Sequence, residues 1–394
     1  LHHMIQYICP SGQTRSAGRA NALTVAPTGY LWGDAVVKGV PVPARDPNHE
    51  RGGRHVDTSL PPAGRLAGLR GRHYLTDIDY TREELEDLLR LAVNLKALWR
   101  RRRLTPFFPG HHVALIFEAA STRTRVSFEN GFAELGGTSV YLRPGEIHLP
   151  GRETIADTAR TLAQYNSAIV IRAKKNETVD ELARWSPVPV VNAMDGDRHP
   201  CQSMSDALTI LEHAGTLQGV TFAYIGDAAH PCNSLATTLT KLGLHVRIGN
   251  APGYEIKPEL VKLAEQYAAE SGGSFLLTND PLEAIAGADF IYTDCWWWTG
   301  QEAEYEDRVR AFKPFQVNPE LWSHTKPGAR FMHCLPAMRG EEVVDEIADG
   351  PMSIIFPQAQ NRLHFQKALL LALIGLDELP ADPELAEIAR AVVA

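Results

Sequence analysis

The stretch that decides the fold is VALIFEAASTRTRVSFENGFAELGG, residues 113–137. It opens with five apolar residues, 113–117, a run typical of a strand that is buried on both faces. Directly after STRTR, at 121–125, apolar residues recur with the spacing of a helix. A buried strand that leads at once into a helix is the repeating unit of parallel sheets covered by helices. The stretch therefore predicts an α/β fold.

Seven further apolar runs repeat this pattern along the chain. They lie at 168–173, 188–194, 221–227, 244–250, 274–280, 289–294 and 329–336. Helix-like stretches such as 259–271 separate these runs, so consecutive strands are expected to be parallel and joined by helical crossovers. We predict two doubly wound domains, each with a central parallel sheet, joined by two helices.

The predicted domain limits follow from composition and from these runs. Residues 1–70 are rich in Gly, Pro, Arg and Ser and predict a poorly packed N-terminal arm. The first domain is expected to span 71–205, closed by a helix at 361–376, and the second to span 206–360. A tail at 377–394 predicts a further helix that helps oligomerisation. Its apolar residues at helical spacing are Leu385, Ile388 and Val392.

Composition and charge narrow the class of protein. The chain has 394 residues and a net charge of −8, which disfavours binding to nucleic acids or to anionic membranes. No apolar run reaches the roughly 18 residues that a membrane helix needs. Five cysteines are scattered without a CxxC pair, which is typical of a reducing compartment and argues against a zinc ribbon. We expect a cytoplasmic protein with no nucleic-acid or membrane partner.

The end of the first predicted strand has the chemistry of an anion site. In parallel sheets, ligands bind beyond the carboxyl ends of the strands, and a helix that begins there presents unpaired N–H groups. Ser121, Thr122 and Thr124 add hydroxyl donors, and Arg123 adds a planar guanidinium suited to phosphate. The alternative is a basic surface turn. Arg125, one position beyond, is expected to be structural.

Other strand ends carry further polar groups. Arg172 ends one strand, and His199 and Gln202 follow the next, where an imidazole can donate to a carbonyl oxygen. A lone His at such a place is more often structural. Asp294, after the run at 289–294, can hold a cationic amine.

The last two predicted strand ends add backbone and aromatic groups. The turn at Cys334 and Leu335 offers carbonyl oxygens to an NH2 group, and Pro336 is a candidate for a cis bond. Cys334 has no adjacent base, so the nucleophile interpretation competes with a small buried side chain. Of the three Trp residues at 296–298, we expect two to pack and not to bind ligand. Arg362 ends the final polar cluster.

Three motifs, in this order, are similar to those of the aspartate/ornithine carbamoyltransferase family. They are FEAASTRTRVSFE (117–129), HPCQ (199–202) and HCLPAMRGEEVVDE (333–346), and the resemblance runs from about residue 72 to about 376. It implies a first domain that binds carbamoyl phosphate, a second that binds an amine acceptor, and a homotrimer with active sites between subunits. It implies direct attack of a neutral amine on a polarised carbonyl, with phosphate as leaving group and no metal or other cofactor.

The resemblance assigns roles to particular residues. The implied catalytic residues are Arg123, Arg172, His199 and Cys334. The implied carbamoyl phosphate ligands are Ser121, Thr122, Arg123, Thr124, Arg172, His199, Gln202, Cys334, Leu335 and Arg362, with His148 from a neighbouring subunit. The implied acceptor ligands are Asp294, His230, Trp298 and Thr299.

The chain departs from the family pattern around the acceptor. Ornithine enzymes resemble DVWVSMG after the acidic strand, whereas residues 294–300 here read DCWWWTG, with Trp298 and Thr299 at the head-group positions. His230 stands where the family has an Asn for the α-carboxylate, and could replace it if protonated. His148 stands where the family has a Gln. Three stretches are similar to putrescine carbamoyltransferases, namely 141–158, 272–294 and 333–346.

Several functions stay open at this point. The leading one is transfer of a carbamoyl group to an ornithine-like diamine, either ornithine or putrescine. Another amine acceptor, or a silent family member that acts as a binding protein, are the alternatives. A nicotinamide dehydrogenase is disfavoured, because YIGDAAHPCNS at 224–234 lacks the glycines of GxGxxG.

Overall fold

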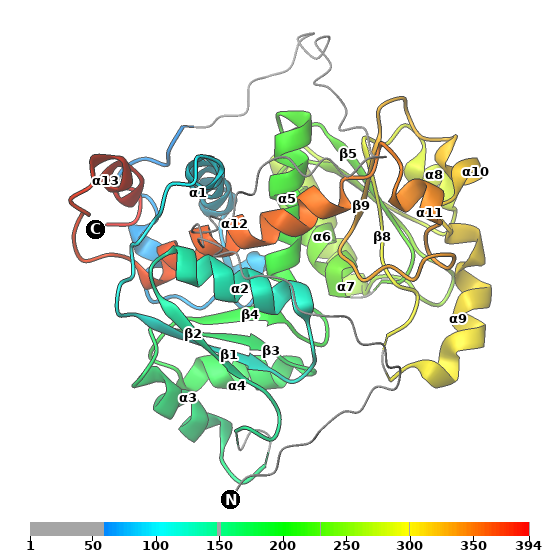
Figure 1. Ribbon diagram of the computed structural model, residues 1–394. Coiled ribbons are helices and arrows are strands. Elements are labelled where there is room, and N and C mark those ends of the chain that lie inside the picture. The colour runs from blue at the N-terminus through cyan, green and yellow to red at the C-terminus, as the bar shows by residue number, and fades with distance from the viewer. Residues whose placement is uncertain (1–58, 148–150, 229, 299, 394) are drawn as a thin grey trace, which may run out of the picture. The chain divides into compact units, whose positions relative to one another are not determined.

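The structure is a computed structural model that describes residues 59–147, 151–228, 230–298 and 300–393 (Figure 1). Within these residues the strands form two sheets. One has four strands in the order β2-β1-β3-β4, and the other has five in the order β7-β6-β5-β8-β9. Neighbouring strands are parallel throughout both sheets. The predicted α/β class, with a central parallel sheet in each half, is confirmed.

All eight predicted strands are present, and one further strand, β2, joins them. The first sheet contains β1 (His112–Phe117), β2 (Thr138–Leu142), β3 (Ala168–Arg172) and β4 (Val190–Met194). The second contains β5 (Thr221–Ile225), β6 (His245–Gly249), β7 (Ser274–Thr278), β8 (Phe290–Thr293) and β9 (Arg330–His333). β2 forms an edge of its sheet and its side chains are half-buried or exposed, so it lacks the apolar run by which the other strands were predicted.

Helices follow most of the strands. The α-helices are α1 (Arg82–Arg100), α2 (Thr122–Glu134), α3 (Ile155–Ala163), α4 (Asn176–Trp185), α5 (Pro200–Ala214), α6 (His230–Lys241), α7 (Pro258–Ser271), α8 (Pro281–Ile285), α9 (Tyr305–Phe312), α10 (Pro319–Trp322), α11 (Asp345–Ala348), α12 (Ile355–Ile374) and α13 (Pro383–Ala389). Short 3-10 helices are η1 (Ala67–Leu69), η2 (Asp77–Asp79), η3 (Glu302–Glu304) and η4 (Lys313–Phe315). None of the described helices is both long and apolar enough to span a membrane.

The side chains of β1 show why both faces of the first sheet are covered. Val113, Leu115 and Phe117 point into a core formed with α1, α2, α5 and α12. Ala114 and Ile116 point the other way, into a second core with α3 and α4. Successive residues of a strand face opposite sides, so an unbroken apolar run needs helices on both faces. The second sheet follows the same rule.

α5 and α12 join the two halves, as predicted. α5 packs against β4 and α6, while α12 packs against α1, α2, α5 and β9 (Figure 1). The first core continues through these helices from β1 to Phe222 and Tyr224 of β5. α12 begins at Ile355, before the predicted start at residue 361, because Ile354 and Ile355 are buried at its first turn.

Part of the predicted N-terminal arm is packed. Leu66 and Leu69 are buried, the N–H of Leu66 donates to the carbonyl oxygen of Ala391 (2.8 Å), and that of Gly71 donates to Leu373 (2.8 Å). The prediction of a poorly packed arm is therefore wrong for residues 59–70. Two leucines three positions apart fall on one side of a helical turn, a signal that the Gly- and Pro-rich composition masked. Residues 1–58 lie outside the described residues.

The tail forms the predicted helix, α13. Leu385, Ile388 and Val392 are buried within this chain, in the same core as Leu66 and Leu69. The apolar spacing that motivated the oligomerisation hypothesis is thus already satisfied by intrachain packing.

Candidate active site

A small cavity lies where the carboxyl ends of strands from both sheets meet α2, α5 and α12. It brings together most of the residues singled out in the sequence. The lining comprises Ser121, Arg123, Thr124, Arg172, Met194, His199, Gln202, Pro231, Asp294, Trp298, Cys334, Leu335, Pro336 and Arg362. Two predicted residues are placed differently: Thr122 is exposed, and His230 lies behind the lining against Trp298. His148 and Thr299 lie outside the described residues.

The N-terminus of α2 forms one wall. Ser121 caps the helix, and its Oγ accepts a hydrogen bond from the N–H of Thr124 (3.4 Å). Thr124 is buried, and its Oγ1 accepts from Nη2 of Arg362 (3.2 Å). Arg125 points elsewhere, pairing with Glu129 (3.0 Å) and stacking on a tyrosine ring, as expected of a structural residue. A helix N-terminus with hydroxyl donors is a ready site for an anion.

Three guanidinium groups concentrate positive charge at this wall. Arg123, Arg172 and Arg362 all line the cavity, and none makes an ion pair with a carboxylate in the described part of the chain. Burial, followed by the charges of Arg362 and Arg123, lowers the pKa of Arg172 to about 10. Arg172 therefore stays charged at neutral pH, and the wall carries a net positive charge.

His199 is a neutral imidazole in the middle of the cavity. It is the N-cap of α5, its side chain is buried, and Nδ1 has no hydrogen-bond partner among the described residues. Burial, followed by the charges of Arg362 and Arg172, holds the pKa of His199 well below its usual range. A neutral imidazole carries one N–H group, which can donate a hydrogen bond to a carbonyl oxygen.

Gln202 is held by two partners. Its Oε1 accepts from Nη1 of Arg362 (2.5 Å), and its Nε2 donates to Oδ1 of Asp206 (2.8 Å). The same Asp206 oxygen accepts from Nε2 of Gln358 (2.8 Å), whose Oε1 accepts from the N–H of His333 (2.9 Å). Burial raises the pKa of Asp206 to about 7. Asp206 and Gln358 were not predicted; the available signal was that Asp206 lies one helical turn after Gln202.

The turn after β9 closes the cavity between the two walls. Leu335 has a positive φ of 61°, and the Leu335–Pro336 peptide bond is cis, as anticipated for this proline. The N–H of Leu335 donates to Nδ1 of His333 (2.8 Å), which ties the turn to its strand.

Asp294 supplies negative charge on the opposite wall. Its Oδ1 accepts from the N–H of Cys295 (2.9 Å) and from the Cys334 thiol (3.1 Å), whereas Oδ2 has no partner in the described residues. Burial raises the pKa of Asp294 to about 6, so it is largely ionised at neutral pH. Burial and the neighbouring Asp294 raise the pKa of Cys334, which makes it a thiol donor and not a nucleophile.

The Trp-rich loop borders this wall. Trp298 lines the cavity and contacts His230 edge to face, with ring centroids 5.6 Å apart. Trp296 stacks on Phe312 in the core, and Trp297 donates to Glu341 (3.0 Å). Two of the three Trp side chains therefore pack or bond within the fold, as expected.

His230 cannot supply the positive charge that the sequence suggested. Burial, followed by the nearby Arg172, lowers its pKa to about 4, so the imidazole is neutral at pH 7. Its Nδ1 and the Nε1–H of Trp298 are buried without a hydrogen-bond partner among the described residues. Among the described residues, this wall thus offers the Nε1–H of Trp298 and a neutral imidazole, and no cation.

The fold and cavity define a class: an α/β enzyme that brings an anionic substrate and an amine together at the strand ends of two sheets. Residues 72–212 match the carbamoyl-P binding domain of aspartate/ornithine carbamoyltransferase, and residues 218–373 match its Asp/Orn binding domain. The chain belongs to the aspartate/ornithine carbamoyltransferase family and is a carbamoyltransferase.

Known relatives agree with this assignment. The ornithine carbamoyltransferase of Anoxybacillus flavithermus is 49% identical over 307 residues, which cover 78% of this chain and 98% of the relative. That of Thermococcus kodakarensis is 47% identical over 310 residues, covering 79% and 98%. Among solved structures, ornithine carbamoyltransferase from Pyrococcus furiosus is similar with a TM-score of 0.76 and 47% identity, covering 78% of this chain and 98% of that one.

Proposed function

We propose that the protein transfers the carbamoyl group of carbamoyl phosphate to the side-chain amine of ornithine, giving citrulline and phosphate. The observation that carries the proposal is the division of charge in one cavity. Three unpaired guanidinium groups and a helix N-terminus form one wall, and a carboxylate with a free oxygen forms the other. A dianionic phosphate and an amine complement these walls.

The proposed mechanism uses these groups in place. Ser121, Thr124 and the arginines hold the phosphate, and His199 donates a hydrogen bond to the carbonyl oxygen. Gln202 and the backbone at residues 334–335 hold the carbamoyl NH2. The neutral amine attacks the carbonyl carbon, a C–N bond forms, the C–O bond to phosphate breaks, and the departing phosphate takes the amine proton. Rate enhancement then comes from positioning and fixed electrostatics.

Ornithine is proposed as the acceptor because the similar proteins are named ornithine carbamoyltransferases, and the similarity covers nearly their full length. A second candidate, putrescine, has one observation in its favour. The wall around Trp298 carries no cation among the described residues, and a buried carboxylate without a partner costs several kcal/mol. For ornithine, the Nε1–H of Trp298, which lines the cavity and has no partner among the described residues, is proposed to receive the carboxylate.

The test is a ureido-product assay with carbamoyl phosphate against ornithine, putrescine, lysine and agmatine in parallel. We expect citrulline formation to have the highest kcat/KM. A preference for putrescine or agmatine would replace ornithine by a carboxylate-free amine. The absence of both ureido product and phosphate release with every amine would refute carbamoyl transfer and favour a binding protein.

We also propose a homotrimer, as the family resemblance implies. Light scattering combined with size-exclusion chromatography measures it directly: a mass about three times that of the chain is expected, and a monomer would contradict the proposal.

A further inference from the structure

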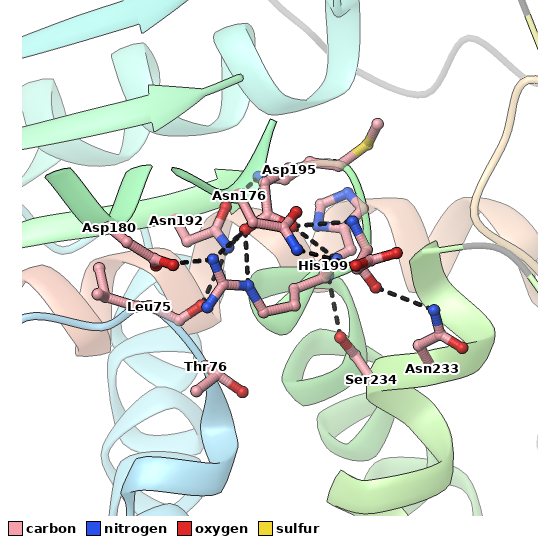
Figure 2. A network of polar contacts seen from close by, with 12 residues as sticks. Leu75, Thr76, Asn176, Asp180, Asn192, Asp195, His199, Asn233 and Ser234 are labelled. Atoms are coloured by element: carbon pink, nitrogen blue, oxygen red, sulfur yellow. Dashed lines mark hydrogen bonds and ion pairs between the residues drawn. The ribbon is translucent and has the colours of Figure 1, made fainter. Parts of the chain in front are cut away.

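The backbone segment 195–199, which ends at His199, is shaped by a buried carboxylate from within its own half of the chain (Figure 2). Oδ1 of Asp195 accepts from the N–H groups of Asp197 (3.0 Å) and Arg198 (2.7 Å). Its Oδ2 accepts from Nδ2 of Asn192 in β4 (2.8 Å). These bonds turn the chain from β4 into α5, but none of them reaches His199 itself.

The bond that reaches His199 comes from the other half of the chain. The N–H of His199 donates to Oγ of Ser234 on α6 (2.9 Å), and Nδ2 of the neighbouring Asn233 donates to the carbonyl oxygen of Asp197 (3.1 Å) (Figure 2). Nζ of Lys257, at the start of α7, pairs with Asp197 (2.7 Å). Both α6 and α7 follow strands of the second sheet.

The His199 side chain is buried and held by packing. Its Nδ1 has no hydrogen-bond partner in the described residues, so a hydrogen bond at that nitrogen does not fix the ring. The position of the imidazole then depends on packing and on its backbone, whose N–H is bonded to Ser234. A displacement of about 1 Å at a reacting centre can cost about 100-fold in rate.

We propose that Ser234 is a positioning residue for His199, so that the acceptor half of the chain sets the alignment of the imidazole that faces the carbonyl. This inference rests on the proposed function, because it takes His199 as the group that polarises the carbonyl. The same helix begins with His230, which contacts Trp298, and Pro231, which lines the cavity. One rigid element thus borders the acceptor and anchors His199.

The first experiment compares Ser234→Ala with Thr238→Val, a matched control. Thr238 is buried on the same helix, one turn on, and its hydroxyl has no partner among the described residues. Loss of one buried hydrogen bond predicts that Ser234→Ala lowers kcat about tenfold, with KM for carbamoyl phosphate changed less than about twofold. Thr238→Val is expected to change kcat less than about twofold.

The second experiment repeats both substitutions in a His199→Ala background. If Ser234 acts through His199, its substitution changes the residual kcat less than about twofold there, because coupled residues are not additive. An equal loss in both backgrounds, or a loss no larger than that of Thr238→Val, would overturn the inference.

A third measurement separates this inference from the proposed function. In the wild-type protein the His199 N–H is protected by Ser234, so hydrogen exchange of a peptide covering 195–199 should be faster in Ser234→Ala and unchanged in Thr238→Val. Unchanged exchange in both variants refutes the anchoring. A wild-type protein that forms no ureido product refutes the proposed function, and the exchange result still decides whether Ser234 anchors the segment.

Discussion

Replacing Asp294 by asparagine should stabilise the unliganded protein and abolish most of its activity. Asp294 is fully buried, and burial raises its pKa from the ordinary 3.8 to about 6. At 1.36 kcal/mol per pH unit, this rise corresponds to a cost of about 3 kcal/mol for keeping the carboxylate ionised in the folded state. Asparagine has the same shape and carries no charge, so it escapes that cost.

The pH dependence gives the sign of the effect. A carboxylate whose folded pKa is raised makes no unfavourable contribution below about pH 4, where both states are protonated, and its full unfavourable contribution above about pH 6. Asp294→Asn should therefore raise the free energy of unfolding by up to about 3 kcal/mol at pH 8, and by much less at pH 4.5. The same change removes the partner of the acceptor amine, so kcat/KM for the amine should fall about 100-fold or more.

The assay is urea unfolding at pH 8 and pH 4.5, alongside steady-state kinetics. Asp289→Asn is the matched control: it precedes the same strand at the opposite end and accepts from the N–H of Thr221 (2.9 Å), so its loss should give no stabilisation at either pH. Two results would refute this reasoning. The free energy of unfolding of Asp294→Asn could be lower than that of wild type at pH 8, or it could differ from wild type by the same amount at both pH values. Either result would show that other groups of the free protein stabilise the ionised carboxylate.

Three further predictions test other parts of the structure. Trp298→Phe keeps an aromatic ring and removes the buried Nε1–H. KM for ornithine should therefore rise about tenfold, while kcat/KM for putrescine changes little. Equal effects on both amines would show that Trp298 does not bind the carboxylate. Arg362→Lys removes the guanidinium group, which donates hydrogen bonds to both Gln202 and Thr124. KM for carbamoyl phosphate should then rise at least about 30-fold, and an unchanged KM would contradict this prediction. Leu66→Ala should lower the free energy of unfolding by about 2–5 kcal/mol, whereas exposed Leu104→Ala should leave it nearly unchanged; equal losses in the two variants would contradict the packing of residues 59–70.

The parts of the fold that could be predicted from sequence are those whose secondary structure follows from one local pattern of residues. An apolar run such as 168–173 is compatible with little other than a strand covered on both faces, and the helix that follows 113–117 defines the parallel connection. β2 escaped prediction because an edge strand needs only a half-buried face. Leu66 and Leu69 were missed because their partners lie in the tail, more than 300 residues further along the chain.

The residues of the site also divide into those that a local sequence pattern predicts and those that it does not. The strand ends indicated where the site would lie, and most of the residues singled out there line the cavity. Gln202 and Arg362 reach it from helices α5 and α12. The charge state of His230 was not predictable, because a pKa depends on burial and on Arg172, which lies on another element. Asp206 was missed for a related reason: Gln358, one of its two bonding partners, is 152 residues away.

The electrostatics of the cavity explain why its opposite charges remain separate without substrate. One oxygen of Asp294 accepts hydrogen bonds from Cys295 and Cys334. The other oxygen has no partner among the described residues, and it forms no ion pair with Arg123, Arg172 or Arg362, which line the same cavity. A direct ion pair would stabilise the free protein and would have to be broken before either substrate could bind. Keeping the charges on separate walls leaves the guanidinium groups for an anion and the carboxylate for an amine. In the proposed reaction the carbonyl carbon, joined to the anion and attacked by the amine, lies between these groups, and His199 lines the same cavity.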